Sequence, residues 1–236
     1  MKTSLNFLSA TLAAALLAGA AHANTGSVSQ LSGTLSVRKA DGSVRILSQK
    51  SEIASGDTLS TERDTYAQIK FTDGGQITLK PSTSVKIEDF KFSEEKPQED
   101  SFLFSLVKGG LRAVTGIVGK RSRDNYRMNT ATATIGIRGT TFTADDCFNR
   151  RDGDCGPLEP AVHVSVVDGE VVVKNAHGEL ACPAGTFCMI GKDQRPLFLS
   201  TDTGLQFTPP ASFIQSVMAG SAVNSGKSLE CQVKAR

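Results

Sequence analysis

The five cysteines have the most versatile side chains in this sequence, because a thiol can act as a metal ligand, a redox partner or a nucleophile. They are Cys147, Cys155, Cys182, Cys188 and Cys231. Cys147 stands near Cys155, and Cys182 near Cys188, so the spacing favours two disulfides if the chain is exported to an oxidising compartment. Zinc is the alternative, but paired zinc ligands usually stand about two to four residues apart and have His partners. Disulfides are therefore the preferred interpretation, and we expect no metal site.

The sequence shows no recognisable arrangement of catalytic groups. Cys231 alternates with apolar residues as in a strand, which favours a buried thiol or a distant disulfide partner over a nucleophile. We interpret His163 as a strand-face residue and His177 as part of a surface turn. The stretch 116–121 lacks the first Gly and the final Ser or Thr of a phosphate-binding loop. We therefore expect no enzymatic activity and no cofactor.

A basic stretch is the strongest candidate for a binding surface. Its six positive residues, set against the single acid Asp124, are Lys108, Arg112, Lys120, Arg121, Arg123 and Arg127. They could attract phosphorylated lipid headgroups, anionic glycans or an acidic partner surface. The preceding segment 88–100 is acidic, with six acids and two lysines. Because exposed charges are screened within about 8 to 10 Å, we favour a solvated loop balanced by this acidic segment.

Arg138 is a second candidate, at the end of an expected strand. Ala131, Ala133, Ile135 and Ile137 alternate with Thr and Gly, which predicts a narrow apolar inner face with Arg138 on the opposite face. Its guanidinium could hold backbone carbonyls or a nearby carboxylate, with Asp145 and Asp146 as candidates. The alternative is that Arg138 binds an anionic ligand. We favour the structural role, because Arg beside strand-terminal glycines usually stabilises local structure.

The elements that must position these residues are predicted to be strands. Apolar and polar residues alternate through much of 27–92, in runs separated by Asp41-Gly42, Gly56-Asp57 and Asp73-Gly74-Gly75. Asp-Gly pairs suit tight hairpin turns, and Asp168-Gly169 and, more weakly, His177-Gly178 predict two more. Strand starts recur about every eight to twelve residues, as in a sandwich, barrel or β-solenoid. One short helix is expected after Thr208, with Phe213, Ile214, Val217 and Met218 on one face.

Several short motifs together resemble the FecR domain family of exported bacterial proteins. The most specific is Gly136-Ile137-Arg138-Gly139-Thr140, which resembles the family's G-[IV]-R-G-T segment. Upstream, 56–61 resembles its G-D-x-[IL]-x-T entry, 66–79 its strand, Asp-Gly turn and strand unit, and 110–112 its G-x-[LV]-R element. The resemblance implies an all-β fold, a stack of short hairpins that is β-solenoid or sandwich-like. In the best-known members, the resemblance implies a relay between an iron-siderophore receptor and a cytoplasmic sigma factor.

The start of the sequence departs from those relay members. Lys2, an uncharged run over 5–21 and Ala21-His22-Ala23 predict a cleaved signal peptide, 1–23, which leaves 213 residues with near-balanced charge. No later stretch approaches the roughly 18 consecutive apolar residues that a membrane helix needs. The Trp-rich cytoplasmic segment and membrane helix of the relay are not found. We therefore expect a stand-alone protein of the periplasm, or one secreted beyond it.

These observations divide the chain into four predicted segments. They are the signal peptide 1–23, N-terminal strands over 24–55, a FecR-like domain over 56–175, and a disulfide-containing extension over 176–236. We expect a signalling or scaffold protein that binds an envelope protein or glycan and does not bind nucleic acid. The alternative is an anionic small molecule or ferric complex, bound at the basic stretch 108–127 and Arg138.

Overall fold

The computed structural model describes residues 25–148, 155, 156, 158–200, 205, 207, 209, 211, 213 and 214, with the backbone alone at Arg123. The predicted signal peptide and Cys231 lie outside these residues. So does most of the predicted C-terminal helix, including Val217 and Met218, whereas Ala211, Phe213 and Ile214 are helical. Within the described residues, no helix is long and apolar enough to cross a membrane.

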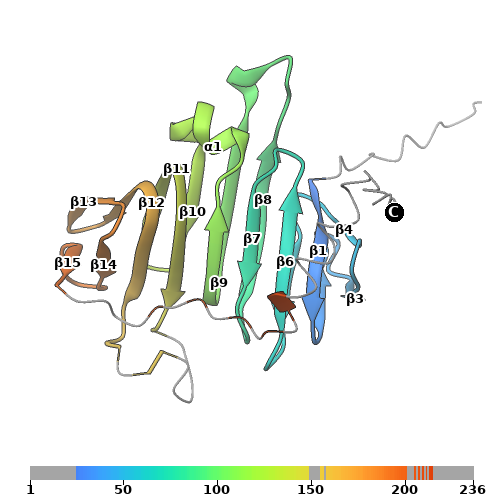
Figure 1. Cartoon of the computed structure of the whole chain (residues 1–236), viewed down its shortest axis with the longest axis horizontal. Coiled ribbons are helices and arrows are strands. Elements are labelled where there is room, and N and C mark those ends of the chain that lie inside the picture. The colour runs from blue at the N-terminus through green and yellow to red at the C-terminus, as the bar shows by residue number, and fades with distance from the viewer. Residues whose placement is uncertain are drawn as a thin grey trace, which may run out of the picture.

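The described residues form one 15-stranded sheet, which confirms the prediction of an all-β fold (Figure 1). The strands are β1 (Gly26–Ser32), β2 (Leu35–Arg38), β3 (Val44–Leu47), β4 (Glu52–Ile53), β5 (Thr58–Thr61), β6 (Tyr66–Phe71), β7 (Gln76–Leu79), β8 (Ser84–Lys91), β9 (Ser101–Val114), β10 (Tyr126–Asn129), β11 (Thr134–Asp146), β12 (Val162–Asn175), β13 (Gly178–Pro183), β14 (Phe187–Ile190) and β15 (Leu197–Leu199). Three short helices interrupt them: η1 (Pro97–Glu99), α1 (Ile117–Arg121) and η2 (Arg123–Asn125).

The strands pair in two rows that share three long members, β9, β11 and β12. The first row runs β4, β1, β6, β7, β9, β11, β12, β14 and β15. The second row runs β3, β2, β5, β8, β9, β10, β11, β12 and β13. All neighbours are antiparallel except β9 and β10, which are parallel. Pairing therefore continues across both predicted segment boundaries, since β1 pairs with β6 and β12 pairs with β13.

Each long strand has a glycine at the point where it passes from one row to the other. These are Gly109, Gly139 and Gly169, with φ of 90°, 65° and 77°. Residues with a side chain rarely adopt such φ values, whereas glycine does so without steric cost. The hairpin predicted at Asp168-Gly169 is wrong for this reason: the same left-handed residue that closes a tight turn also bends a continuous strand. Here Gly169 bends β12, and the chain does not reverse.

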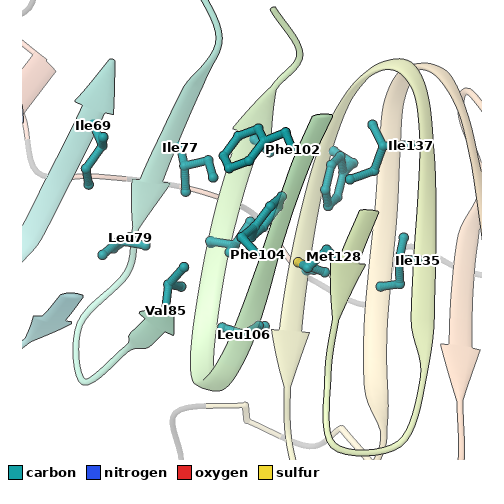
Figure 2. Close-up of a cluster of buried hydrophobic side chains, with 14 of the residues drawn as sticks. Ile69, Ile77, Leu79, Val85, Phe102, Phe104, Leu106, Met128, Ile135 and Ile137 are labelled. Atoms are coloured by element: carbon teal, nitrogen blue, oxygen red, sulfur yellow. The ribbon is translucent and has the colours of Figure 1, made fainter. Parts of the chain in front are cut away.

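The alternating apolar residues of both rows pack into one core, as predicted (Figure 2). Phe102, Phe104 and Leu106 of β9 lie at its centre and are at most 1% exposed. Tyr126 of β10 stacks on Phe102, with ring centres 5.1 Å apart, and Phe71 of β6 packs on the same ring at 4.6 Å. At roughly 1.5 to 3 kcal/mol for each buried large side chain, this cluster is a main source of stability. It fixes β10 and the start of β11 on the body of the sheet.

Candidate functional site

Arg121, a prominent cation of the basic stretch, is committed to holding the fold together. Its Nε lies 2.6 Å from Oδ2 of Asp100, which is fully buried, and its Nη2 donates to the carbonyl oxygen of Ser93 at 2.6 Å. Its guanidinium also lies over the ring of Phe92, 5.2 Å from the ring centre. The predicted balance between the acidic and basic segments is therefore confirmed for Arg121, which ties α1 to the loop that carries η1. The predicted solvated loop is wrong, because most of the basic stretch lies in β9, α1, η2 and β10.

Arg112 belongs to a different surface. It lies on β9 between Thr78 of β7 and Thr143 of β11, on the outer face of the first row. Its guanidinium carbon is 6.0 Å from the centre of the Phe207 ring, within range of a cation–π contact. Together with Gln76 and Thr78 it lines a hollow of about 260 Å³ beneath the C-terminal segment. The structure therefore does not bring Arg112 together with Arg138.

Three of the predicted cations gather on the outer face of the second row. Arg127 of β10 and Arg138 of β11 line one groove, and the side chain of Lys120 passes over Gly139, next to Arg138. Arg127 Nε donates to the carbonyl oxygen of Asp124 at 2.8 Å, which orients its guanidinium along η2. Lys108 is exposed on β9, and the backbone of Arg123 lies in η2.

The groove has a volume of about 390 Å³ and lies across β10, β11, β12 and β13. Its lining residues are Asp124, Arg127, Thr134, Gly136, Arg138, Val172, Lys174 and Glu179. Gly136 stands between Arg127 and Val172 in the register of adjacent strands, and its missing side chain leaves the middle of the groove hollow. A Cβ at Gly136 would meet nothing closer than the carbonyl oxygen of Val172 at 3.7 Å. We call this surface the β10–β13 groove.

Both signs of charge line the β10–β13 groove. Arg138 Nη1 lies 3.0 Å from Oε1 of Glu170, its neighbour across β11 and β12. Lys174 Nζ lies 3.8 Å from Oε2 of Glu179, and both of those side chains are more than half exposed. Exposed ion pairs of this kind contribute at most about 1 kcal/mol, so their partners can be exchanged for a ligand at little cost. The lining of the groove therefore offers three cations, Arg127, Arg138 and Lys174, and two acids, Asp124 and Glu179.

Arg138 does not contact Asp145 or Asp146, so that prediction is wrong. Gly139 separates Arg138 from the second half of β11, and that half belongs to the first row. There the carboxylate of Asp145 accepts from Lys80 Nζ at 2.7 Å, with the Asp145 side chain 1% exposed. The pair lies over Gly110, where a Cβ would overlap the carboxylate. The predicted parity is confirmed for Ala133, Ile135 and Ile137, which are buried, and for Arg138, which is exposed. It is wrong for Ala131, which lies exposed in the bend before β11 begins.

Buried aspartates explain most of the short motifs, and sequence reasoning missed this role. Asp57 is 1% exposed and accepts from Lys39 Nζ at 2.7 Å and from the backbone N–H of Ala54 at 2.9 Å. Asp73, in the turn between β6 and β7, accepts from the N–H groups of Gly75 and Val118. The signal for such a role is an Asp beside turn glycines, because short carboxylates readily accept from nearby backbone N–H groups.

Four of the cysteines and two of the histidines lie among the described residues, and there they have structural roles. The predicted disulfides are both present, Cys147 with Cys155 and Cys182 with Cys188. His163 lies buried in β12, with Nε2 2.9 Å from the carbonyl oxygen of Glu159, and His177 is exposed in the turn before β13. Across the described part of the chain, no group of three or more His, Cys, Asp and Glu is arranged to hold a metal ion.

The chain is similar to a family model and to solved structures. Residues 57–172 match the family model described as FecR protein. Two crystal structures of a candidate anti-sigma factor from Parabacteroides distasonis ATCC 8503, at 1.65 and 2.50 Å resolution, are similar to this chain. Each is 16% identical with a TM-score of 0.46, and the match covers 62% of this chain and 60% of the other. No curated protein matches the chain significantly. The family match includes all of the motifs on which the resemblance depends except Gly56, the first residue of the entry motif, and it assigns the chain, through residues 57–172, to the FecR family.

Proposed function

We propose that this chain is a non-enzymatic signalling or scaffold protein of the periplasm, which binds an envelope protein or glycan in the β10–β13 groove. The observation that carries the proposal is the groove itself: charged side chains of both signs, held on four adjacent strands around the open space at Gly136. Mixed charges on a rigid surface suit recognition, because they orient a partner and exclude partners with the wrong charge pattern.

The charged groups outside the groove support a binding role over catalysis. Asp57, Asp100 and Asp145 are each buried against a Lys or Arg, and Asp73 is bonded to backbone N–H groups. These carboxylates have structural partners, and a general acid or base must instead be able to reach substrate. In the groove, by contrast, Arg138 and Lys174 are held only by exposed ion pairs and remain able to meet a ligand.

The proposed location follows from the disulfides and the predicted signal peptide. Disulfides form and persist in oxidising compartments such as the bacterial periplasm. Cys182 and Cys188 join the end of β13 to β14, and both are fully buried, so this bridge is part of the folded body. The bridge therefore supports folding after export, which is what the sequence at 1–23 predicts.

Photocrosslinking in intact cells tests the proposal. A photoreactive residue at Thr134, an exposed position in the groove, should give one dominant adduct with an envelope protein or glycan. The matched control is Thr72, an exposed threonine in the turn between β6 and β7. The same set of abundant bystanders from both positions would overturn the proposal.

A small anionic ligand, such as a carboxylate-rich ferric complex, is the second candidate. It is favoured by one observation: Arg127, Arg138 and Lys174 line the same groove, and Arg side chains bind carboxylates through paired hydrogen bonds. Titration calorimetry with citrate and with ferric citrate tests it. The heat of binding should disappear when all three cations are changed to Ser, and it should remain when Arg63, Lys70 and Lys91 are changed to Ser instead. That result would support this candidate over the first.

A further inference from the structure

β3 is an open edge of the second row. Among the residues that the structure describes, β2 is the one strand that pairs with it. The strands at the other row ends are shorter or contain a Pro: β4 has two residues, β15 has three, and β13 ends in Pro183. Natural edge strands are usually protected by Lys, Pro or a bulge, because their unpaired backbone groups can pair with another chain. The four residues of β3 contain one charge, Arg45, and no Pro.

The hydrogen-bond pattern shows which backbone groups of β3 face outward. Lys39 donates its N–H to the carbonyl oxygen of Ser43 at 2.8 Å, so these two residues form a bonded pair of the β2–β3 ladder. Bonded and non-bonded pairs alternate along an antiparallel ladder. The next bonded pairs are therefore 37 with 45 and 35 with 47. It follows that Val44 and Ile46 direct their N–H and C=O groups away from β2.

Val44 and Ile46 also have the most exposed apolar side chains at this edge. Val44 is 60% exposed and Ile46 is 66% exposed. Both are β-branched, and such residues stabilise strands by packing against a neighbour on the same face. The outward backbone groups and the exposed apolar side chains thus belong to the same two residues, which is the arrangement that a further strand would cover.

We propose that an extended segment of a partner protein adds to β3 as a further antiparallel strand, with an acidic residue opposite Arg45. Strand addition of this kind supplies affinity through the main chain and specificity through alternate side chains. The acidic residue is expected because Arg45 is exposed on the β3 face opposite to Val44 and Ile46, and its neighbour on β2 is the uncharged Val37. This site lies outside the β10–β13 groove and does not depend on the function proposed for the groove.

A second copy of the chain is a poorer occupant. Two β3 strands that pair about a two-fold axis, each using the outward groups of Val44 and Ile46, place Arg45 directly opposite Arg45 of the other copy. That position is a non-hydrogen-bonded pair, in which side chains come closest. Like charges directly opposite each other destabilise a pair of strands. A partner strand with Glu or Asp at this position converts the same contact into an attraction.

A short peptide provides the probe. The sequence acetyl-Thr-Ile-Glu-Val-Thr-amide, aligned antiparallel to β3, places Glu opposite Arg45 and lets Ile and Val exchange hydrogen bonds with Ile46 and Val44. Amide exchange measured residue by residue in the full folded chain should slow about five-fold at Val44 and Ile46 once most of the protein is bound. The amides of Arg45 and Leu47 already pair with β2 and should not change. The control peptide carries N-methyl groups on Ile and Val, which removes its donors, and should give no protection.

Two variants separate strand addition from other binding. Ile46→Pro removes an N–H that points off the edge, so the sheet keeps its bonds while the incoming strand loses one. It should retain the melting temperature of the wild type and abolish protection at Val44, whereas Ile46→Thr should retain protection. Arg45→Glu should weaken binding of the Glu peptide by up to about five-fold and strengthen binding of a Lys peptide to a similar extent.

The proposal is overturned by any of three results. In the first, the amides of Val44 and Ile46 exchange as fast with millimolar peptide as they do without it. In the second, Ile46→Pro binds the peptide as the wild type does. In the third, protection appears without peptide and grows with protein concentration, which would assign the edge to a second copy. The Thr134 crosslink reports on the groove alone. The result at β3 can therefore be distinguished from the result at the groove.

Discussion

Arg121 and Asp100 form an ion pair that joins the two oppositely charged segments of the chain, with Nε of Arg121 2.6 Å from Oδ2 of Asp100. Asp100 is fully buried at the start of β9, and Arg121 ends α1. The loop that carries η1 and the helix α1 lie at the same end of the sheet (Figure 1). The acidic and basic segments of the sequence thus meet at this pair, and Arg121 has a structural role.

Removal of Arg121 should therefore cost stability without affecting recognition. Arg121→Gln leaves the Asp100 carboxylate buried without its cation, and breaking such a pair costs about 3 kcal/mol. Arg127→Gln is the matched control, because Arg127 is exposed and bonds a backbone oxygen; it should cost less than about 0.5 kcal/mol. Urea unfolding measures both. Equal losses would contradict the division between structural and groove cations.

The two glycines of the Gly136–Thr140 motif should respond differently to alanine. Gly139 has φ of 65°, so Gly139→Ala should destabilise the fold by about 1 kcal/mol. Gly136 lies in regular strand with room for a Cβ, so Gly136→Ala should change stability by less than about 0.5 kcal/mol. Thermal unfolding of the two variants checks this. A larger loss for Gly136→Ala would show that the groove is more tightly packed than described.

Tyr126 should make the fold sensitive to alkaline pH. Burial, with a smaller contribution from the nearby charge of Asp73, raises the pKa of the Tyr126 phenol well above its ordinary value. A group whose pKa is raised by folding contributes full stability below its unfolded pKa, about 10, and loses it as pH rises further. Stability should therefore fall above pH 10 by up to about 1.4 kcal/mol per pH unit from this group.

Tyr126→Phe isolates that effect, because it keeps the ring stacked on Phe102 and removes the ionisable group. The other ionisable groups are the same in both proteins, so their contributions cancel in the comparison. The difference in unfolding free energy between wild type and variant, followed from pH 8 to 11, should thus change above about pH 10. A constant difference across that range would contradict the burial of the phenol.

The Cys182–Cys188 disulfide should stabilise the chain by about 2 kcal/mol, the value expected for a short closed loop. The double variant Cys182→Ala/Cys188→Ala should lower the melting temperature accordingly. The other bridge, Cys147 with Cys155, supplies the comparison in a second double variant. Mass mapping without reductant should recover both bridges in exported wild-type protein. Free thiols at all four positions would contradict an oxidising location.

The strands could be predicted from sequence because each signal was local. Leu35 with Val37, and Ile77 with Leu79, alternate with polar residues and are buried as predicted. The hairpin at Asp41-Gly42 is also confirmed, since Gly42 has φ of 84° and joins β2 to β3. Asp168-Gly169 could not be distinguished from such a turn, because a turn and a strand bend use the same backbone conformation.

The candidate site was predicted only in part, because its geometry depends on pairing between distant strands. Arg127 and Arg138 were singled out, and they meet in one groove. Lys174 and Glu179 complete the groove from β12 and β13, and nothing near them in the sequence connects them to Arg138. Glu170 is the partner of Arg138 through the register of β11 and β12. The register of these two strands shifts between Arg138 and Thr141 and again between Thr141 and Phe142, and no local pattern in the sequence specifies those shifts.

Binding by the β10–β13 groove is the central claim, and one affinity measurement tests it most directly. The partner isolated through Thr134 is titrated with wild-type protein, with the triple variant Arg127/Arg138/Lys174→Ser, and with the triple variant Arg63/Lys70/Lys91→Ser as a charge-matched control. If all three proteins unfold at similar temperatures, the groove variant should bind at least about ten-fold more weakly, and the control should bind as the wild type does. Equal affinity of all three proteins would contradict the assignment of the groove.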